Sequence, residues 1–139
     1  MNESPHQPWL RAAILVGVVY ALVGIAFAVP ATHVQAWRLA AWVVSAIAYA
    51  AHVAYEHFRL RNSPLSAALH VGLAVALGAF GLAVGANIHS LSTGSTDQHR
   101  QLLLLSLAIW PLITALPAFL VALGISAVLA RAFSIAQAT

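Results

Sequence analysis

The sequence predicts an all-α fold: a single membrane domain, residues 1–139, in which four helices form an integral membrane bundle with antiparallel neighbours. Hydrophobic residues make up 62% of the 139 residues and charged residues only 6%, whereas a soluble domain carries about 25% charged residues. Four apolar runs are each long enough to cross a hydrocarbon core of about 30 Å at about 1.5 Å per residue. The first two links between them are short, and short links make consecutive helices antiparallel neighbours.

The first predicted helix covers residues 9–29. Its apolar run is longer than the core of a signal peptide, which spans about 7–15 residues, so we expect a membrane helix. The second predicted helix covers residues 36–57, and a polar or aromatic side chain recurs at every third or fourth position. In an α-helix such positions share one face. This face, the polar stripe, consists of Arg38, Trp42, Ser45, Tyr49, His52, Glu56 and Arg59.

The third predicted helix covers residues 65–87 and follows a short turn. Ser63 has the residue type of an N-cap, and Pro64 fits the first helical position. Glycines recur along this helix, and small residues let membrane helices approach each other closely. We therefore expect a close-packing face for another helix of this chain or of a partner, in a homo-oligomer or with a larger membrane protein. This face comprises Gly72, Gly78, Gly81 and Gly85.

The fourth predicted helix covers residues 102–130 and contains Pro111 and Pro117. Proline removes a backbone donor, so we expect a kink or a tilt, with the Thr114 hydroxyl satisfying the carbonyl that Pro117 frees. The preceding link, residues 89–101, is rich in Ser and Thr, and we expect it to be a loop in solvent.

The charges predict an orientation in the membrane. The formal net charge is +3, but the arginines are scattered singly near helix ends, which is typical of topology signals and not of a nucleic-acid surface. With alternating helices, one side carries four arginines and the other carries two, in order Arg11, Arg59, Arg61, Arg131 and then Arg38, Arg100. Positively charged loops stay inside, so we expect both termini in the cytoplasm, at a bacterial inner membrane.

One end of the second and third helices is the predicted site. Glu56 is the only carboxylate in the four apolar runs, and an ionisable residue in hydrocarbon needs a partner, water or a ligand. His52 precedes it by one helical turn, and His70 stands at a similar depth on the other side of the short turn. His52, Glu56 and His70 could therefore converge about two turns inside the cytoplasmic boundary, provided that His70 faces the second helix.

Several roles are open for these residues. His52 and His70 could be the axial ligands of a haem b, because two histidines on different helices at one depth are its minimum requirement. Alternatively, His52 and Glu56 could relay a proton, with Tyr49 and Trp42 lining a route or a quinone headgroup site. The three residues could also hold a divalent metal, although no further ligand is evident and we predict no metal site. In the fourth interpretation they only pack and form hydrogen bonds between helices.

The motifs of common enzyme classes are missing from the sequence. There is no Gly-rich phosphate loop, no G-x-S-x-G elbow, no H-E-x-x-H and no cysteine. We therefore expect no catalytic residues. The sequence favours a non-enzymatic membrane subunit, or a protein that handles protons or transports or binds a small solute, with its polar site in the cytoplasmic half. The alternative is a membrane anchor for electron transfer that binds haem b or quinone.

Overall fold

The computed structural model describes residues 8–28, 34–93 and 97–136, all of which lie in helices or in the one described turn. The helices are α1 (Pro8–Ala28), α2 (Val34–Phe58), α3 (Pro64–Thr93) and α4 (Asp97–Ala136). Each of the four is long and apolar enough to cross a membrane. The all-α fold with four helices long and apolar enough for a membrane is thus confirmed. Long apolar segments enter lipid, and in lipid a helix is favoured because it satisfies its own backbone polar groups.

The prediction that residues 89–101 form a loop in solvent is wrong for most of this segment. α3 continues to Thr93 and α4 already begins at Asp97, so helix replaces most of the expected loop. The hydroxyl of Ser92 donates to the carbonyl of His89 at 2.7 Å, as serine does within a helix. A polar composition marks exposure to water, and an exposed segment can be a helix as well as a loop. The link itself, residues 94–96, lies outside the described residues.

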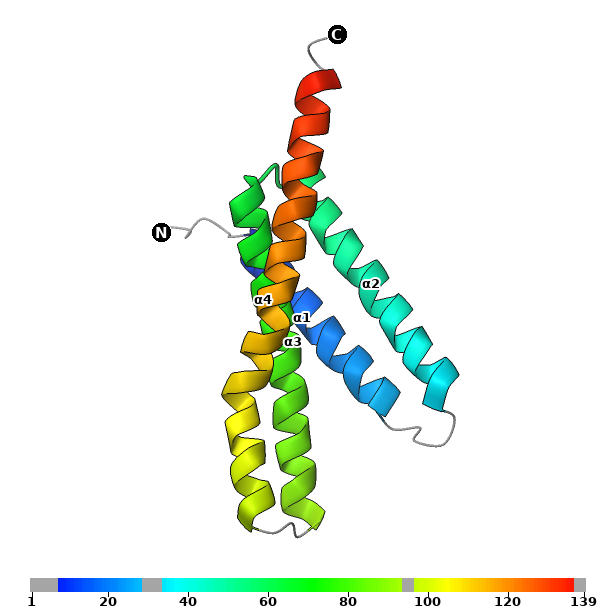
Figure 1. Ribbon diagram of the computed structural model, residues 1–139, viewed down its shortest axis with the longest axis vertical. Helices are drawn as coiled ribbons and strands as arrows, with labels where there is room; N and C mark the ends of the chain where they lie inside the picture. Colours follow the sequence, from blue (N-terminus) through cyan, green and yellow to red (C-terminus); the bar gives the residue numbers. More distant parts are fainter. Residues whose placement is uncertain (1–7, 29–33, 94–96, 137–139) are drawn as a thin grey trace, which may run out of the picture.

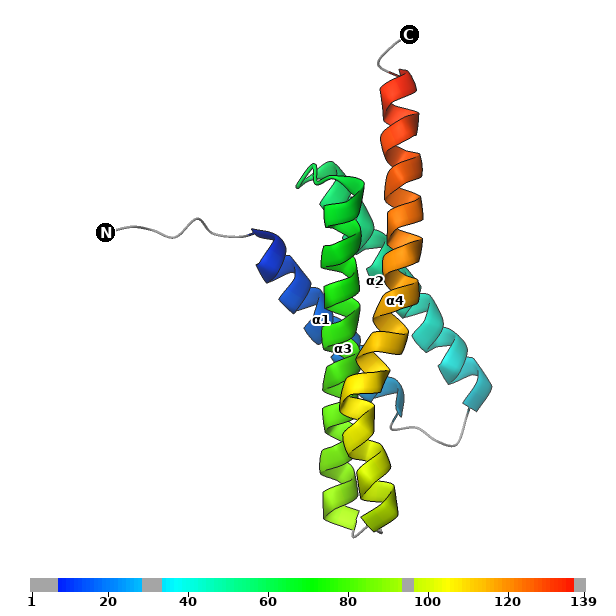
Figure 2. The ribbon, with the colours of Figure 1, turned by 60° about the vertical axis from the view of Figure 1, so that its left-hand side comes forward.

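The four helices do not pack equally. α3 and α4 form a long antiparallel hairpin, and α1 crosses one face of α3 (Figure 1). α2 packs least extensively against the other helices and leans away from the hairpin, with its closest approach at the end where it turns into α3 (Figure 2). The hydrophobic core near this end is built from small residues and a few larger ones packed on them: Val53, Ala68, Val71, Ala122, Tyr49, Phe119 and Leu123.

Glycines allow α1 and α3 to cross closely. A Cβ atom added at Gly78 would lie 2.5 Å from the Cβ of Tyr20, and one added at Gly17 would lie 2.9 Å from the Cβ of Leu77. Atoms cannot approach so closely, so these positions accept only glycine at this helix spacing. The predicted packing face is therefore used within the chain at Gly78, and also at Gly81.

Two further glycines of the predicted face differ. A Cβ at Gly72 would lie 3.3 Å from the Cβ of Phe119 on α4, whereas a Cβ at Gly85 would meet no atom within 4 Å. Three of the four glycines thus face helices of this chain, and only Gly85 remains open. Packing of this face against a second protein stays a prediction, and it would have to use the region around Gly85.

α4 bends in the region of its two prolines (Figure 2). The hydroxyl of Thr114 donates to the carbonyl of Trp110 at 2.9 Å and approaches that of Pro111 at 3.1 Å. The carbonyl freed by Pro117 belongs to residue 113, so the expected role of Thr114 is wrong. The side chain instead bonds back one turn, the usual choice of threonine in a helix.

Candidate functional site

The turn between α2 and α3 shapes the candidate site. Arg61 has a φ of 51°, the left-handed conformation that non-glycine residues rarely adopt. This conformation reverses the chain, and the backbone N–H of Asn62 then donates to the carbonyl of Glu56 at 3.2 Å. Asn62 is thereby folded back onto the last turn of α2, so its side chain can reach the side chain of Glu56.

The start of α3 sets the position of His70. The backbone N–H of Ser66 donates to the Oγ of Ser63 at 3.3 Å, and the N–H of Ala67 donates to the carbonyl of Ser63 at 2.9 Å. Ser63 is therefore the N-cap and Pro64 the first residue of the helix, as predicted. His70 follows within two helical turns, which places it opposite the end of α2.

Glu56 lies at the centre of the site, and none of its surface is exposed. Its Oε2 atom lies 2.9 Å from the Nδ1 of His70 and accepts a hydrogen bond of 2.6 Å from the Nδ2 of Asn62. Its Oε1 atom lies 3.6 Å from the Nε2 of His52, one helical turn earlier on α2. The structure thus brings together His52, Glu56 and His70, and it adds Asn62 from the turn between α2 and α3.

The contact between Glu56 and His70 can hold a proton on either side. A carboxylate accepts from the Nδ1–H tautomer of His70, while a neutral carboxyl group donates its own proton to a bare Nδ1. The distance of 2.9 Å suits both arrangements. Moving the proton therefore requires no rearrangement of the helices.

On the side of His52, the polar atoms of the site lack hydrogen-bond partners. Oε1 of Glu56 and both ring nitrogens of His52 are buried and have no hydrogen-bond partner. His52 is only 3% exposed. A buried polar atom without a partner costs about 1–3 kcal/mol, so three such atoms side by side indicate a place for a proton, a water molecule or a small polar ligand.

Trp9 is a part of the site that sequence reasoning missed. Its ring stacks on the imidazole of His70, with ring centroids 4.4 Å apart and planes inclined by 8°. The sequence suggested no such contact, because a tryptophan near a helix end is typical of the aromatic belt at the membrane surface. The stack covers one face of His70 and fixes the orientation of its ring.

Ser126 of α4 is a buried polar residue at a depth similar to that of the site. It is fully buried and its hydroxyl has no partner. The hydroxyl of Tyr49 on α2 donates to the carbonyl of Ala118 on α4, which fixes the register of these two helices. Ser126 follows Ala118 by about the same rise as Glu56 follows Tyr49, so both stand at a similar depth.

The middle of the polar stripe lies apart from this cluster. Trp42, Ser45 and Tyr49 line a separate cavity, and Trp42 is 76% exposed. The predicted site residues thus divide into two groups: His52, Glu56 and His70 at the turn, and Trp42 and Tyr49 in the cavity. The two groups are one helical turn apart on α2.

The geometry bears on the two cofactor interpretations. Nε2 of His52 and Nδ1 of His70 both lie against the carboxyl group of Glu56, so these two nitrogens are directed at Glu56 and not at a shared open space. In the described ranges, no group of three or more His, Cys, Asp or Glu side chains has an arrangement suited to a metal ion. The cluster as it stands fits hydrogen bonding and proton exchange.

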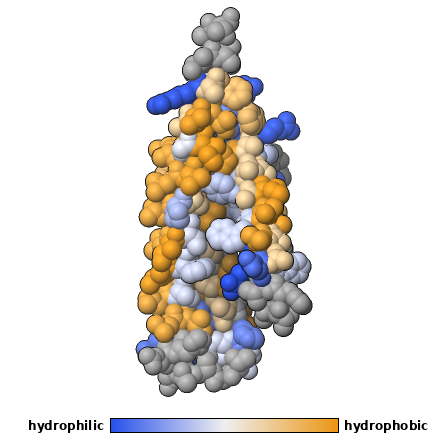
Figure 3. Space-filling view, turned by 45° about the vertical axis from the view of Figure 1, so that its right-hand side comes forward, coloured by the Kyte–Doolittle hydropathy of each residue, from blue (hydrophilic) through white to orange (hydrophobic). Residues whose placement is uncertain are grey.

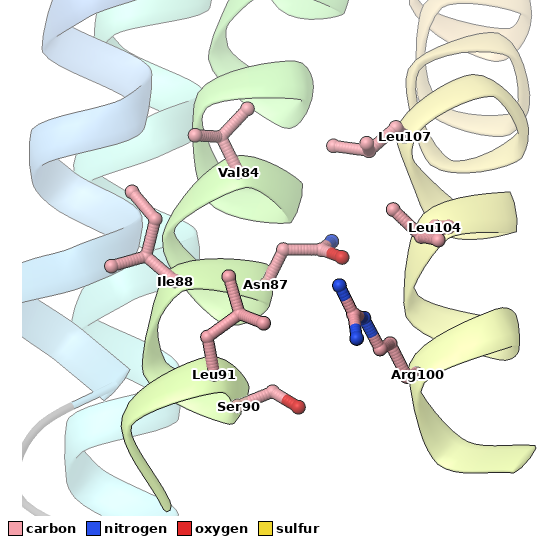
Figure 4. Close-up of a pocket in the computed structure, with 8 residues that line it drawn as sticks. All are labelled: Val84, Asn87, Ile88, Ser90, Leu91, Arg100, Leu104 and Leu107. Atoms are coloured by element: carbon pink, nitrogen blue, oxygen red, sulfur yellow. The ribbon is translucent and has the colours of Figure 1, made fainter. Parts of the chain in front are cut away.

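A smaller, mostly apolar cavity lies between α3 and α4 near their connecting link, with a volume of about 160 Å³. Figure 4 shows Asn87 of α3 and Arg100 of α4 pointing toward each other across it. The Nδ2 of Asn87 donates to the carbonyls of Ala83 and Leu103 at 2.8 and 2.9 Å. Asn87 thus ties the two helices together, which is a structural role.

Comparison with known protein families, curated proteins and solved structures finds no match to this chain. What can be said of its function therefore rests on the site itself.

Proposed function

We propose that this chain is a non-enzymatic membrane protein that binds and exchanges a proton at Glu56, with His52 and His70 as its proton partners. The observation that carries the proposal is the pairing of one buried carboxyl group with two imidazoles. The imidazole of His70 is hydrogen-bonded to the carboxyl group at 2.9 Å. The Nε2 of His52 lies 3.6 Å from the carboxyl group, and neither nitrogen of this ring has a hydrogen-bond partner. Intramembrane ionisable residues that face the protein interior are typical of proton relays.

His52 is the entry side of this relay. It borders a mostly apolar cavity of about 630 Å³ between α1 and α2, which Arg11 and Tyr55 also line. Oε1 of Glu56 is 3.6 Å away, so a proton on Nε2 would be donated to it after a small movement. Asn62 holds Oε2 from the other side, which keeps the carboxyl group oriented toward both histidines.

The predicted orientation determines from which side of the membrane the relay takes its protons. With both termini in the cytoplasm of a bacterial cell, the turn between α2 and α3 faces the cytoplasm, and Arg59 and Arg61 stand at that surface. The site would then exchange protons with the cytoplasm. A homo-oligomer or a larger membrane partner would use the proton state of this site, and the open region around Gly85 is available for such contacts.

Infrared difference spectroscopy tests the proposal. Protein in lipid is brought from about pH 5 to about pH 8, the range in which histidine changes charge, and the carboxyl C=O band is followed. We expect a carboxyl signal and an imidazole signal that change together in the wild type. Glu56→Gln removes the carboxyl signal while the helical circular dichroism spectrum is kept.

The matched control is His57→Gln. His57 is adjacent to Glu56 but its ring contacts Phe58 and Phe133, outside the cluster. This variant keeps the carboxyl signal, whereas His70→Gln alters its frequency because the 2.9 Å hydrogen bond is changed. A wild-type difference spectrum identical to that of Glu56→Gln rejects the proposal.

A further inference from the structure

A large cavity lies between the helices, apart from the cluster around Glu56. All four helices line this cavity of about 500 Å³, within the range of about 300–1,000 Å³ that small-molecule sites occupy. Four aromatic residues form part of its wall: Tyr20, Trp42, Tyr49 and Trp110. Figure 3 views the side of the molecule on which α2 lies, where pale, weakly polar side chains line a depression between hydrophobic flanks.

The polar groups of this cavity are few and uncharged: the hydroxyl groups of Tyr20, Ser45, Tyr49 and Thr114 and the indole N–H groups of Trp42 and Trp110. The hydroxyl groups of Tyr49 and Thr114 are already bonded to backbone carbonyls of α4. The hydroxyl of Tyr20 is buried and has no partner. No Asp, Glu, Lys, Arg or His is among the described residues that line the cavity. The cavity therefore suits a neutral molecule that brings one hydrogen-bond acceptor for Tyr20.

A lipid acyl chain would fill the space but leave the hydroxyl unsatisfied, because a hydrocarbon chain has no acceptor. In a membrane interior, where no water is at hand, such a group is costly. Flat aromatic walls favour a planar ring as occupant. Trp42 is 76% exposed, so the cavity opens sideways toward the lipid between α2 and the α3–α4 hairpin.

We propose that this cavity binds a neutral, planar, lipid-soluble carbonyl compound of the quinone class. The hydroxyl of Tyr20 donates to the ring carbonyl, and the ring lies against Trp42 and Trp110. The ligand enters from the bilayer. This inference does not depend on proton exchange at Glu56, which lies further along α2, so each proposal can fail without the other.

Tryptophan fluorescence of the purified protein in detergent measures this binding, with decylubiquinone as the probe. We expect saturable quenching, since Trp42 and Trp110 line the cavity. Tyr20→Phe removes only the donor and raises Kd about tenfold, the effect of one lost hydrogen bond. Tyr55→Phe is the matched control, because this exposed tyrosine lies outside the cavity, and it leaves Kd unchanged.

A cavity-filling variant and a second probe complete the test. Ala46→Phe fills the cavity and abolishes saturable quenching, whereas Ala50→Phe, one turn further on α2 and outside the cavity, keeps it. Decylbenzene has a ring and a tail but no carbonyl, and we expect at least tenfold weaker competition from it. Equal competition by decylbenzene identifies a hydrocarbon-filled groove and overturns the proposal, and so does an unchanged Kd in folded Tyr20→Phe.

Absence of saturable quenching in the wild type also overturns the proposal. If this coincides with a stable dimer, a second copy of the chain covers the cavity instead of a small molecule.

Discussion

Oε2 of Glu56 and Nδ1 of His70 lie 2.9 Å apart, although the two residues belong to different helices, α2 and α3, on either side of a short turn. Two structural features produce this contact. The left-handed Arg61 reverses the chain directly after α2, and the N-cap at Ser63 begins α3 immediately afterwards. A buried carboxyl group is thereby held against an imidazole within the apolar part of the protein, where neither group would be stable alone.

Asn62→Ala tests the support of the carboxyl group. The change removes the 2.6 Å hydrogen bond to Oε2 of Glu56, and we expect it to lower the free energy of unfolding by about 1–3 kcal/mol. Thermal unfolding in detergent, followed by circular dichroism, measures the loss. Ser92→Ala is the control, because this hydroxyl bonds only an exposed carbonyl and its removal changes little. Equal melting temperatures of Asn62→Ala and the wild type contradict the assigned role.

Arg61→Gly tests the conformation of the turn. Arg61 is the one non-glycine residue with a positive φ in the described part of the chain. Glycine adopts this conformation without steric cost, so we expect the variant to gain about 1 kcal/mol in stability. The control is Arg59→Gly, two residues earlier, where φ is not positive; it loses stability because glycine adds freedom to the unfolded chain. We expect Arg61→Gly to melt at a higher temperature than Arg59→Gly, and the reverse order would falsify the left-handed turn.

Gly78→Ala tests the crossing of α1 and α3. The added methyl group would lie 2.5 Å from the Cβ of Tyr20, so the helices must move apart, and we expect a clearly lower melting temperature. Gly85→Ala, two turns further along α3, meets no atom within 4 Å and gains helix propensity, so its melting temperature is equal or higher. A comparable loss in both variants would show that the cause is something other than the contact with α1.

A double-mutant cycle tests the stack of Trp9 on His70. Stability is measured for Trp9→Leu, His70→Ala and the two combined, and we expect a coupling of about 0.5–1.5 kcal/mol, the usual value of an aromatic pair. In the control cycle Trp37→Leu replaces Trp9→Leu. Trp37 stands near the start of α2, at the opposite end from His70, so its effect and that of His70→Ala are additive. If the effects of Trp9→Leu and His70→Ala are also additive, Trp9 is not part of the site.

The sequence by itself determined the number and type of the helices, because in lipid only length and apolar composition are needed to specify a membrane helix. It also determined that His52 and Glu56 share a face and that His70 stands at a similar depth, but it left open whether His70 faces them, which the structure shows. Their distances along the chain from one short turn fix their depth, and helical periodicity places His52 and Glu56 on one face.

Only the tertiary structure decided how each helix is rotated about its axis and against which neighbour it packs. α1, α3 and α4 are apolar on nearly all sides, so hydropathy does not indicate which face looks inward. The stack of Trp9 on His70 and the contact of Gly78 with Tyr20 both depend on this rotation. Asn62 joined the site through the conformation of Arg61, a backbone choice that residue types alone do not reveal.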